Sequence, residues 1–273
     1  MSDILKSNQS LKNLDLKKKL GAIRLIEETA KEIIKDSDLP RMFFQYIIFV
    51  LDASRSMDGL SNKKSSKAEE VHNAVNSVIQ RLEQSKNVNS FDIGLWCFSD
   101  SNYPIFKIKT IKESLAQNYN PIKLIDQPGE TNLNETLIDV EKEIDAYCKI
   151  NYTKNHQVLV LLLTDGAIDD RFESLKTINK IKENKKVTVS AMHLSGFVDE
   201  NSQYYSWDEK SGQIDYNRAW TIEEVKASHE RVGERFREFA SADTFFINTI
   251  DPNEIRKHMI KSISVTSSLD KSL

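Results

Sequence analysis

"FVLDASRSM", residues 49–57, changes abruptly from apolar to polar. The apolar run 46–51 that leads through it is uninterrupted, which predicts a strand buried on both faces, as in a parallel sheet. Asp52 ends this run, and the hydroxyl groups of Ser54 and Ser56 follow at two-residue spacing. A carboxylate and two hydroxyls directly after a buried strand predict a polar site at the carboxyl end of that strand.

Strands and helices alternate along the rest of the chain. Apolar or β-branched runs predict five more strands, at residues 91–98, 105–109, 157–165, 187–194 and 244–249. Apolar residues at three- and four-residue steps predict helices at 16–34, 68–82, 133–147, 225–239 and 251–263, and a short helix after Asp170. The alternation predicts an α/β fold, a three-layer sandwich around a doubly wound, mostly parallel six-stranded sheet. The short connector 99–104 predicts that strand 105–109 is an antiparallel edge strand beside 91–98.

The same patterns divide the chain into two parts. Residues 1–40 are predicted to be an N-terminal amphipathic helical segment that ends near Pro40, and residues 41–273 the α/β domain. An aromatic-rich insertion at 196–224 leaves the carboxyl end of the fifth predicted strand, so we expect it on the same face as Asp52. A loop this long inside a compact domain is usually functional or disordered. Its aromatic residues are Phe197, Tyr204, Tyr205, Trp207, Tyr216 and Trp220.

The composition argues against several classes of partner. The 273 residues include 38 basic and 41 acidic ones, and this net charge of −3 argues against a nucleic-acid partner, which usually demands a basic face. The first ten residues lack an apolar core of signal-peptide length, and no apolar run is long enough to span a bilayer. Cys97 and Cys148 are expected as small buried side chains in a reducing compartment. We therefore expect a cytoplasmic protein that binds neither nucleic acid nor membrane.

A second carboxylate and a third hydroxyl fall at the same edge of the predicted sheet. Asp165 ends an apolar strand as Asp52 does, and Thr131 lies in a loop that opens a helix. Two neighbouring carboxylates repel each other unless a positive charge lies between them. Ligands that are all oxygen suit a hard cation, so the sequence predicts Mg²⁺, with Mn²⁺ or Ca²⁺ as substitutes. The predicted ligands are Asp52, Ser54, Ser56, Thr131 and Asp165.

Some of these positions have a structural alternative. Asp52 could instead cap a loop or helix at the strand end. Asp169 and Asp170 are not among the predicted ligands; they could hold those ligands in place around the metal, but they precede a helix, and capping is the more common role there. His193 ends the strand 187–194, where we expect it to hydrogen-bond to backbone and to lie outside the site.

Three segments together resemble a known family. LDASRSM, GETNL and LLLTDG are similar, in order and spacing, to the three parts of the metal-ion-dependent adhesion site (MIDAS) of von Willebrand factor A (VWA) domains. The resemblance covers residues 44–265 and implies a sheet in the order 3-2-1-4-5-6 with the third strand antiparallel. It also implies that Ser54, Ser56 and Thr131 contact the metal, while Asp52 and Asp165 bind more through water. The ending IKSISVTSSL resembles bacterial TerY-type proteins from tellurium-resistance and stress-response clusters.

Arg55 departs from the pattern of this family, which usually has glycine there. A non-glycine residue restricts the loop backbone, and the guanidinium group would either repel the metal or turn outward and grip a partner carboxylate. A surface arginine without a role is the alternative. Trp207 and Trp220 are candidate anchors of a partner-binding surface, because aromatics rimmed by charge favour interface hot spots. The alternative is an insertion that packs only against itself.

These features predict a binding module and not an enzyme. The module would be a cytoplasmic VWA domain that binds an Asp or Glu of a partner protein through Mg²⁺, as a scaffold or regulator in a bacterial stress-response or phage-defence system. The alternative is a Mg²⁺-dependent phosphohydrolase that uses Asp52, but such enzymes need a second carboxylate two residues on, where Ser54 stands. The sequence also contains no G-x-x-x-x-G-K-[ST] or G-x-G-x-x-G loop to hold phosphates. A third alternative, a metal-free structural domain, rests on Arg55 alone.

Overall fold

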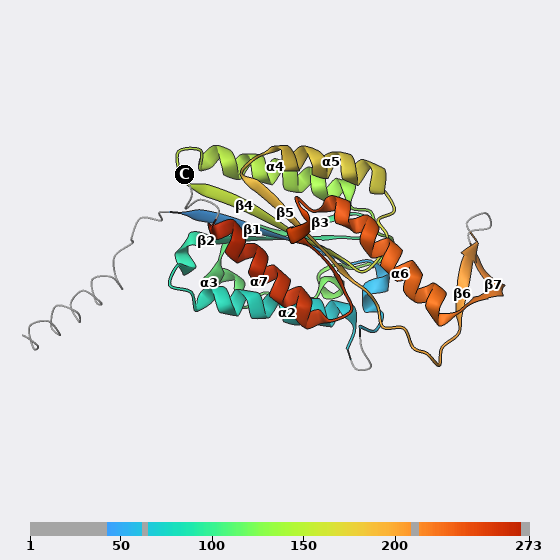
Figure 1. Ribbon diagram of the computed structural model, residues 1–273. Helices are drawn as coiled ribbons and strands as arrows, with labels where there is room; N and C mark the ends of the chain where they lie inside the picture. The colour runs from blue at the N-terminus through green and yellow to red at the C-terminus, as the bar shows by residue number, and fades with distance from the viewer. Residues whose placement is uncertain (1–42, 62–64, 209–212, 269–273) are drawn as a thin grey trace, which may run out of the picture. The chain divides into compact units, whose positions relative to one another are not determined.

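The structure, a computed structural model, describes residues 43–61, 65–208 and 213–268 (Figure 1). The predicted helix at 16–34, and with it the predicted segment 1–40, lies outside the described residues. None of the helices in the described part of the chain is long and apolar enough to cross a membrane.

Six strands form one sheet in which every neighbouring pair but one is parallel. Its order is β3-β2-β1-β4-β5-β8, and the antiparallel pair is β2 with the edge strand β3. The predicted fold class is therefore confirmed, including the antiparallel edge strand. The strands are β1 (Phe44–Asp52), β2 (Phe91–Phe98), β3 (Asn102–Thr110), β4 (His156–Thr164), β5 (Val187–Leu194) and β8 (Phe246–Thr249).

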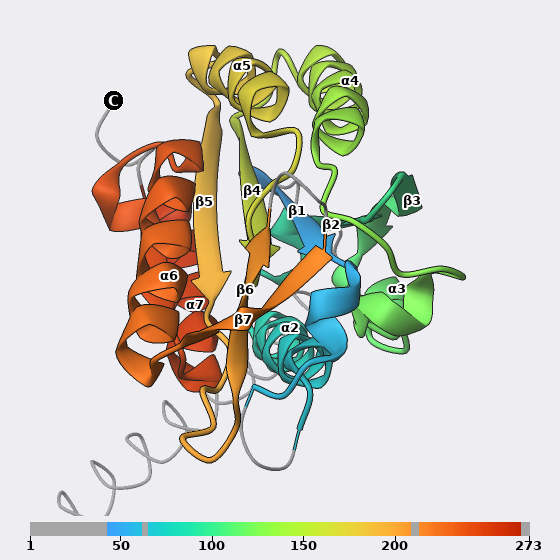
Figure 2. The same ribbon diagram turned by 90° about the vertical axis from the view of Figure 1, so that its right-hand side faces the viewer.

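Helices cover both faces of the sheet and complete the three layers, which Figure 2 shows from the end. One face carries α2 (Lys67–Glu83), α3 (Ile111–Ser114) and α7 (Pro252–Ser268), and the other carries α4 (Asn134–Ile150), α5 (Arg171–Glu183) and α6 (Ile222–Phe236). Short 3-10 turns complete the connections: η1 (Arg55–Asp58), η2 (Val88–Ser90), η3 (Pro121–Leu124), η4 (Arg237–Phe239) and η5 (Asp243–Phe245). The predicted helix 225–239 thus ends in a 3-10 turn, and the predicted strand 244–249 begins two residues late because η5 precedes it.

β1 is a central strand with both faces buried. Odd-numbered residues from Ile47 to Leu51 pack in the core with α2 and α7, and even-numbered residues from Tyr46 to Val50 pack in the core with α4 and α5. All of these side chains are fully buried. Each contributes about 1.5–3 kcal/mol by leaving water. Burial on both faces explains why the sequence shows a continuous apolar run here and not an alternation.

The carboxyl ends of β1 and β4 lie side by side in the middle of the sheet. The helix after β1, α2, covers one face, and the helix after β4, α5, covers the other. Because the chain leaves the two strands toward opposite faces, polar side chains find room between the strand ends. Figure 2 looks onto this edge of the sheet.

The insertion at 196–224, predicted as a loop, contains a two-stranded antiparallel hairpin. Its strands are β6 (Tyr204–Asp208) and β7 (Gln213–Trp220), and α6 follows directly. The rings of Tyr205 and Tyr216 meet edge to face across the hairpin, with centroids 5.2 Å apart. Aromatic side chains favour strands, and this cross-strand pair stabilises the hairpin locally. Figures 1 and 2 show the hairpin on the side of the sheet where the parallel strands end.

Candidate functional site

Polar side chains of β1 and β4 meet where these strands end. The parallel register pairs Leu51 with Leu163, so the next residues of the two strands are neighbours. There the Thr164 hydroxyl donates a hydrogen bond of 2.5 Å to Oδ2 of Asp52. Both residues are fully buried, and Asp165, one position further along, is 9% exposed. The two predicted carboxylates are therefore brought together by the pairing of the two most apolar strands.

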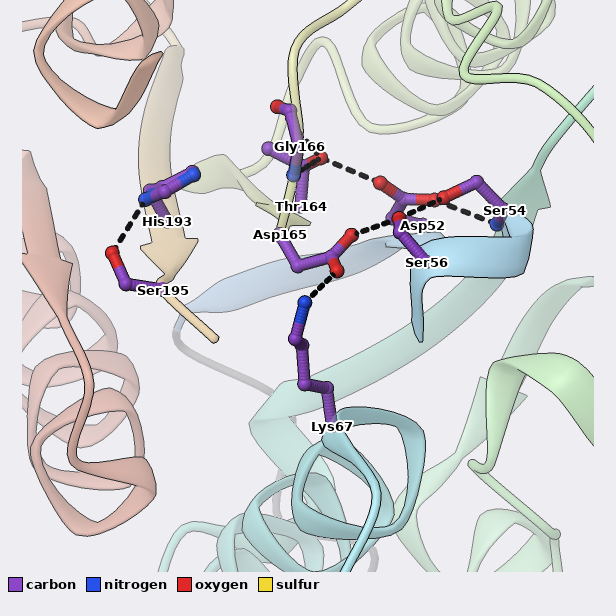
Figure 3. A network of polar contacts seen from close by, with 9 residues as sticks. All are labelled: Asp52, Ser54, Ser56, Lys67, Thr164, Asp165, Gly166, His193 and Ser195. Atoms are coloured by element: carbon purple, nitrogen blue, oxygen red, sulfur yellow. Dashed lines mark hydrogen bonds and ion pairs between the residues drawn. The ribbon is translucent and has the colours of Figure 1, made fainter. Parts of the chain in front are cut away.

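The turn after β1 connects the two carboxylates through hydroxyl groups (Figure 3). The Ser54 amide donates a bond of 2.7 Å to Oδ1 of Asp52, and the Oγ atoms of Ser54 and Ser56 lie 2.9 Å apart. Ser56 Oγ in turn donates a bond of 2.7 Å to Oδ1 of Asp165. We call Asp52, Ser54, Ser56, Thr164 and Asp165 the strand-end network. It contains four of the five predicted ligands.

Thr131, the fifth predicted ligand, lies on a loop that is tied to both neighbouring loops. Its amide donates a bond of 2.8 Å to Oδ2 of Asp169, whose own amide donates to the Thr131 carbonyl at 3.0 Å. Two residues earlier, the Gly129 carbonyl accepts a bond of 3.1 Å from the Arg55 amide. Among the described residues, no hydrogen bond connects the Thr131 side chain to the strand-end network. The backbone contacts place the Thr131 loop beside the network.

Asp170 fixes the start of the helix that follows the Thr131 loop. Its carboxylate accepts bonds from the amides of Leu133 and Asn134, at 2.9 and 2.7 Å, and from the hydroxyl of Ser174 at 2.8 Å. Asp170 therefore satisfies amides at the N-terminus of α4, although it precedes α5 in sequence. The cap crosses from one helix to the other, which a reading of local sequence does not predict.

Asp52 holds its proton more tightly than an exposed aspartate, because it is buried and because Asp165 lies close to it. Burial, and secondly the charge of Asp165, raise the pKa of Asp52 to about 7, although hydrogen bonds from Ser54 and Thr164 act in the opposite direction. A carboxylate in this environment is stabilised by a nearby positive charge.

Lys67 supplies such a charge, and the sequence did not reveal it. Its ammonium group forms an ion pair with Oδ2 of Asp165, and the two side chains are 12% and 0% exposed. Figure 3 shows Lys67 extending from the start of α2 toward Asp165, on the side away from Ser56. The one signal is its position: a lysine in the first turn of a helix is disfavoured by the helix dipole, and an ion pair with an acidic group offsets this.

His193 lies near the network without joining it (Figure 3). The expected bond to backbone is not the one it makes: Nδ1 pairs with the side chain of Asn248 at 2.8 Å and lies 3.3 Å from the hydroxyl of Ser195. Its Nε2 atom is buried and makes no hydrogen bond to the described residues. Burial lowers the pKa of His193, so the ring is neutral at neutral pH.

Arg55 is exposed beside the network, and the two tryptophans are elsewhere. Arg55 lines an open hollow of about 550 Å³ together with Asp100, Gly129 and Glu130. Trp220 ends β7, is half-buried and pairs with Tyr204 across the hairpin. Trp207 lies in β6, where its backbone pairs with that of Ile214. The structure thus places Arg55 at the site and leaves both tryptophans in the hairpin.

The strand-end network fits a hard divalent cation by the chemistry of its donors. Its carboxylates and hydroxyls are all oxygen ligands, and the ammonium group of Lys67 already stands in as a cation on Asp165. In the described part of the chain, no group of three or more His, Cys, Asp and Glu side chains is placed to hold a metal. A cation here would therefore depend on the hydroxyl groups and on water. The pattern differs from a zinc site built of cysteine and histidine.

The comparison with known sequences gives one family. The family model of the von Willebrand factor type A domain matches residues 47–218, which is more than half of the chain. No curated protein sequence matches this chain.

Solved structures with a similar fold come from several kinds of protein. An aerotolerance-related membrane protein from Bacteroides fragilis has a TM-score of 0.53 and 13% identity, over 81% of this chain and 98% of that one. The pilus adhesin SpaC from Lactobacillus rhamnosus GG has a TM-score of 0.56 and 13% identity, over 82% of this chain and 31% of that one. Proximal thread matrix protein 1 from the mussel byssus, with a zinc-occupied MIDAS motif, has a TM-score of 0.51 and 16% identity, over 82% of this chain and 46% of that one. These likenesses concern the fold, and the chain spans less than half the length of the last two proteins.

Proposed function

Because the chain belongs to the von Willebrand factor type A family, we propose that it is a protein-interaction module that binds a carboxylate of a partner protein through a divalent cation. Ser54, Ser56 and Thr131 would contact the cation, and Asp52 and Asp165 would bind it more through water. Mg²⁺ suits these ligands best, with Mn²⁺ or Ca²⁺ as substitutes. When bound, the cation supplies an electrophilic centre with an open position for an Asp or Glu of the partner.

The observation that carries this proposal is the bridge from Asp52 to Asp165. Two buried carboxylates at the ends of adjacent strands are connected through Ser54 and Ser56, and Ser56 itself is exposed. Buried carboxylates with hydroxyl neighbours and an exposed edge favour a cation that a partner can reach. A MIDAS is also named in the mussel protein of the same fold, where it holds zinc.

The alternative of a phosphohydrolase finds less support in the position of Asp52. A nucleophile must reach the phosphorus atom of its substrate, but Asp52 is fully buried. Both of its oxygens also accept hydrogen bonds, from the Ser54 amide and the Thr164 hydroxyl. A phosphatase assay with Mg²⁺ separates the two functions, since turnover that Asp52→Asn abolishes would favour the enzyme.

The cellular setting is a further part of the proposal. We propose a cytoplasmic scaffold or regulator of a bacterial stress-response or phage-defence system, with neither nucleic acid nor membrane as partner. The support is the resemblance of the C-terminal sequence to TerY-type proteins, the net charge of −3 and two free cysteines, of which Cys97 is buried.

Calorimetry tests the metal site directly. Mg²⁺ should bind at one site, weakly because only two side chains are anionic, and Mn²⁺ should replace it. Asp52→Ala and Asp165→Ala should each abolish binding, whereas Glu141→Ala, which removes a carboxylate paired with Lys180 on another surface, should not. If both aspartate variants bind metal like the wild type, the cation site is elsewhere.

The partner is tested by affinity capture with the wild type and Thr131→Ala, each with and without a chelator. Capture that needs the metal and is lost in Thr131→Ala is the expected result. Equal capture in all four conditions would contradict a metal bridge and would leave a metal-independent surface as the binding site.

A further inference from the structure

Lys67 occupies a slot beside the strand-end network. Its amide donates a bond of 2.9 Å to the Gly59 carbonyl, which fixes the start of α2. A methyl group added at Gly196 would lie 3.0 Å from Cε and 3.1 Å from Nζ of Lys67, and one at Gly59 would lie 3.9 Å from each. Gly196 therefore leaves the space through which the lysine side chain reaches Asp165, whereas a methyl group at Gly59 would only touch it at ordinary contact distance. The slot joins the loop after β1 to the loop after β5, where the Phe197 amide donates to the Leu60 carbonyl at 3.3 Å.

The ammonium group neutralises Asp165, and the other basic groups that face the slot do not. His193 and His229 lie near this carboxylate, and burial lowers the pKa of both imidazoles, so they are neutral at neutral pH. The two oxygens of Asp165 are both engaged, Oδ1 by Ser56 and Oδ2 by Lys67. Since the side chain of Asp165 is fully buried, loss of the amine would leave a charge without compensation.

We propose that Lys67 is a tethered competitor for the divalent cation: its ammonium group holds Asp165 in the metal-free protein and must leave this carboxylate when a metal binds. The inference rests on the metal site proposed above. A metal ion and an ammonium group on one carboxylate repel each other, and the helix start keeps the amine permanently near. The four-carbon stem of lysine lets the charge swing toward solvent, to which the side chain is already 12% exposed.

Two cation states follow for this site. In the first, Lys67 compensates Asp165, and the buried carboxylate is stable without metal. In the second, the metal holds the carboxylate and offers a coordination position to the partner. The amine weakens the metal affinity, so that the partner-binding state forms only where the metal concentration is high enough to displace it.

Calorimetry of Mn²⁺ and Mg²⁺ binding to Lys67→Met tests the competition, because methionine keeps the stem and removes the charge. We expect metal affinity at least tenfold higher than in the wild type. Lys67→Arg keeps the charge and should bind metal no more tightly than the wild type. Lys180→Met removes the lysine of a surface ion pair with Glu141 and should leave metal affinity unchanged.

Melting temperatures show whether metal and amine replace each other. In EDTA, Lys67→Met should melt below the wild type, since Asp165 loses its partner, and saturating Mn²⁺ should raise its melting temperature by more than it raises that of the wild type. Gly196→Ala tests the idea with the amine present, because the added methyl group crowds Cε and Nζ and should also tighten metal binding. No left-handed backbone angle at Gly196 opposes this substitution.

The outcomes separate this inference from the proposed metal site. Metal affinity that is unchanged or weaker in Lys67→Met and Gly196→Ala would overturn the competition and leave the metal site standing. Metal binding by Lys67→Met alone, and not by the wild type, would support it strongly. If neither the wild type nor any of these variants binds metal, both proposals fail. If Lys67→Met does not fold in EDTA, the metal affinity of Gly196→Ala decides whether Lys67 competes with the metal.

Discussion

At the residue scale, Asp52 makes the pH response of the metal-free protein predictable. Its pKa is raised from 3.8 to about 7 on folding, so between these values the folded protein keeps a proton that the unfolded chain has lost. This contribution to stability is complete below pH 3.8 and is lost as the pH rises through about 7. In EDTA, we expect the melting temperature of the wild type to fall relative to that of Asp52→Asn between pH ~5 and pH ~8.

The difference between the two proteins is the quantity to measure, because other groups titrate in the same range. Burial lowers the pKa of His193 and His258, so protonation of these residues destabilises the fold as the pH falls, in wild type and variant alike. A difference in melting temperature that stays constant with pH would show that Asp52 is ionised throughout.

Arg55 gives a second prediction at this scale. Its side chain is exposed beside Asp100 and Glu130 and lies on the turn that bears Ser54 and Ser56, so a partner carboxylate at the metal would be within its neighbourhood. Arg55→Gly should weaken partner binding by about 1.5 kcal/mol or more, the usual worth of a hydrogen bond to a charged group, and leave metal affinity similar or tighter. If the variant binds the partner as tightly as the wild type, Arg55 is a surface residue without a role in partner binding.

The residues of the site differ in how far the sequence reveals them. The spacing of Asp52, Ser54 and Ser56 is visible because all three belong to one turn, and Asp165 is visible because it ends an apolar strand. Lys67 is not visible in this way, since its partner lies 98 positions away and its direction depends on the space left at Gly196. The sequence shows which side chains carry oxygen ligands but not which distant charge faces them.

At the scale of elements, Asp170 couples two helices. Its carboxylate accepts from the amides of Leu133 and Asn134, next to the loop that carries Thr131. Asp170→Ala should destabilise the protein by about 1 kcal/mol, as loss of a cap does, and should also weaken metal binding because the Thr131 loop loses its anchor. Urea denaturation and calorimetry on the same variant measure both. Metal affinity that is unaffected would show that the loop is fixed by Asp169 and Arg55 alone.

The hairpin of β6 and β7 is the second element with a prediction. Trp220 is half-buried at its end and adjoins α6, so it can anchor a partner or pack within the hairpin. We expect Trp220→Ala to weaken partner binding by ~2 kcal/mol or more. Tyr152→Ala, at a residue that is 79% exposed, serves as the control for loss of a surface aromatic. A lower melting temperature with unchanged partner affinity would instead make the tryptophan part of the hairpin fold.

The elements of the sheet were more predictable than the hairpin. Strands buried on both faces have continuous apolar runs, and the run Tyr46–Leu51 has the length and composition of such a strand. The strands β6 and β7 mix aromatic with charged residues, so neither an apolar run nor a clear alternation marks them. Their pairing depends on contacts with each other, which local composition does not show.

At the scale of the whole molecule, removal of metal should leave the protein folded. The two cores on either side of the sheet contain no metal ligand, and Asp165 keeps Lys67 as its partner. A ligand at a hundredfold excess over Kd adds ~2.7 kcal/mol of stability. At about 2–4 °C per kcal/mol for a domain of this size, EDTA should lower the melting temperature by roughly 5–10 °C. Complete unfolding in EDTA at room temperature would show that the metal is structural.

The position of β1 in the sheet also has a consequence for synthesis on the ribosome. One edge of β1 pairs with β4, and Thr164 follows Asp52 by 112 positions. At ~5–20 residues per second, that edge waits about 6–20 seconds for its partner strand to be made. During this time a strand whose residues 45–52 are buried in the folded protein presents unpaired amides and carbonyls, an arrangement prone to pair with another nascent chain. The strand-end network is therefore assembled late, because Asp52, Ser54 and Ser56 are made well before Thr164 and Asp165.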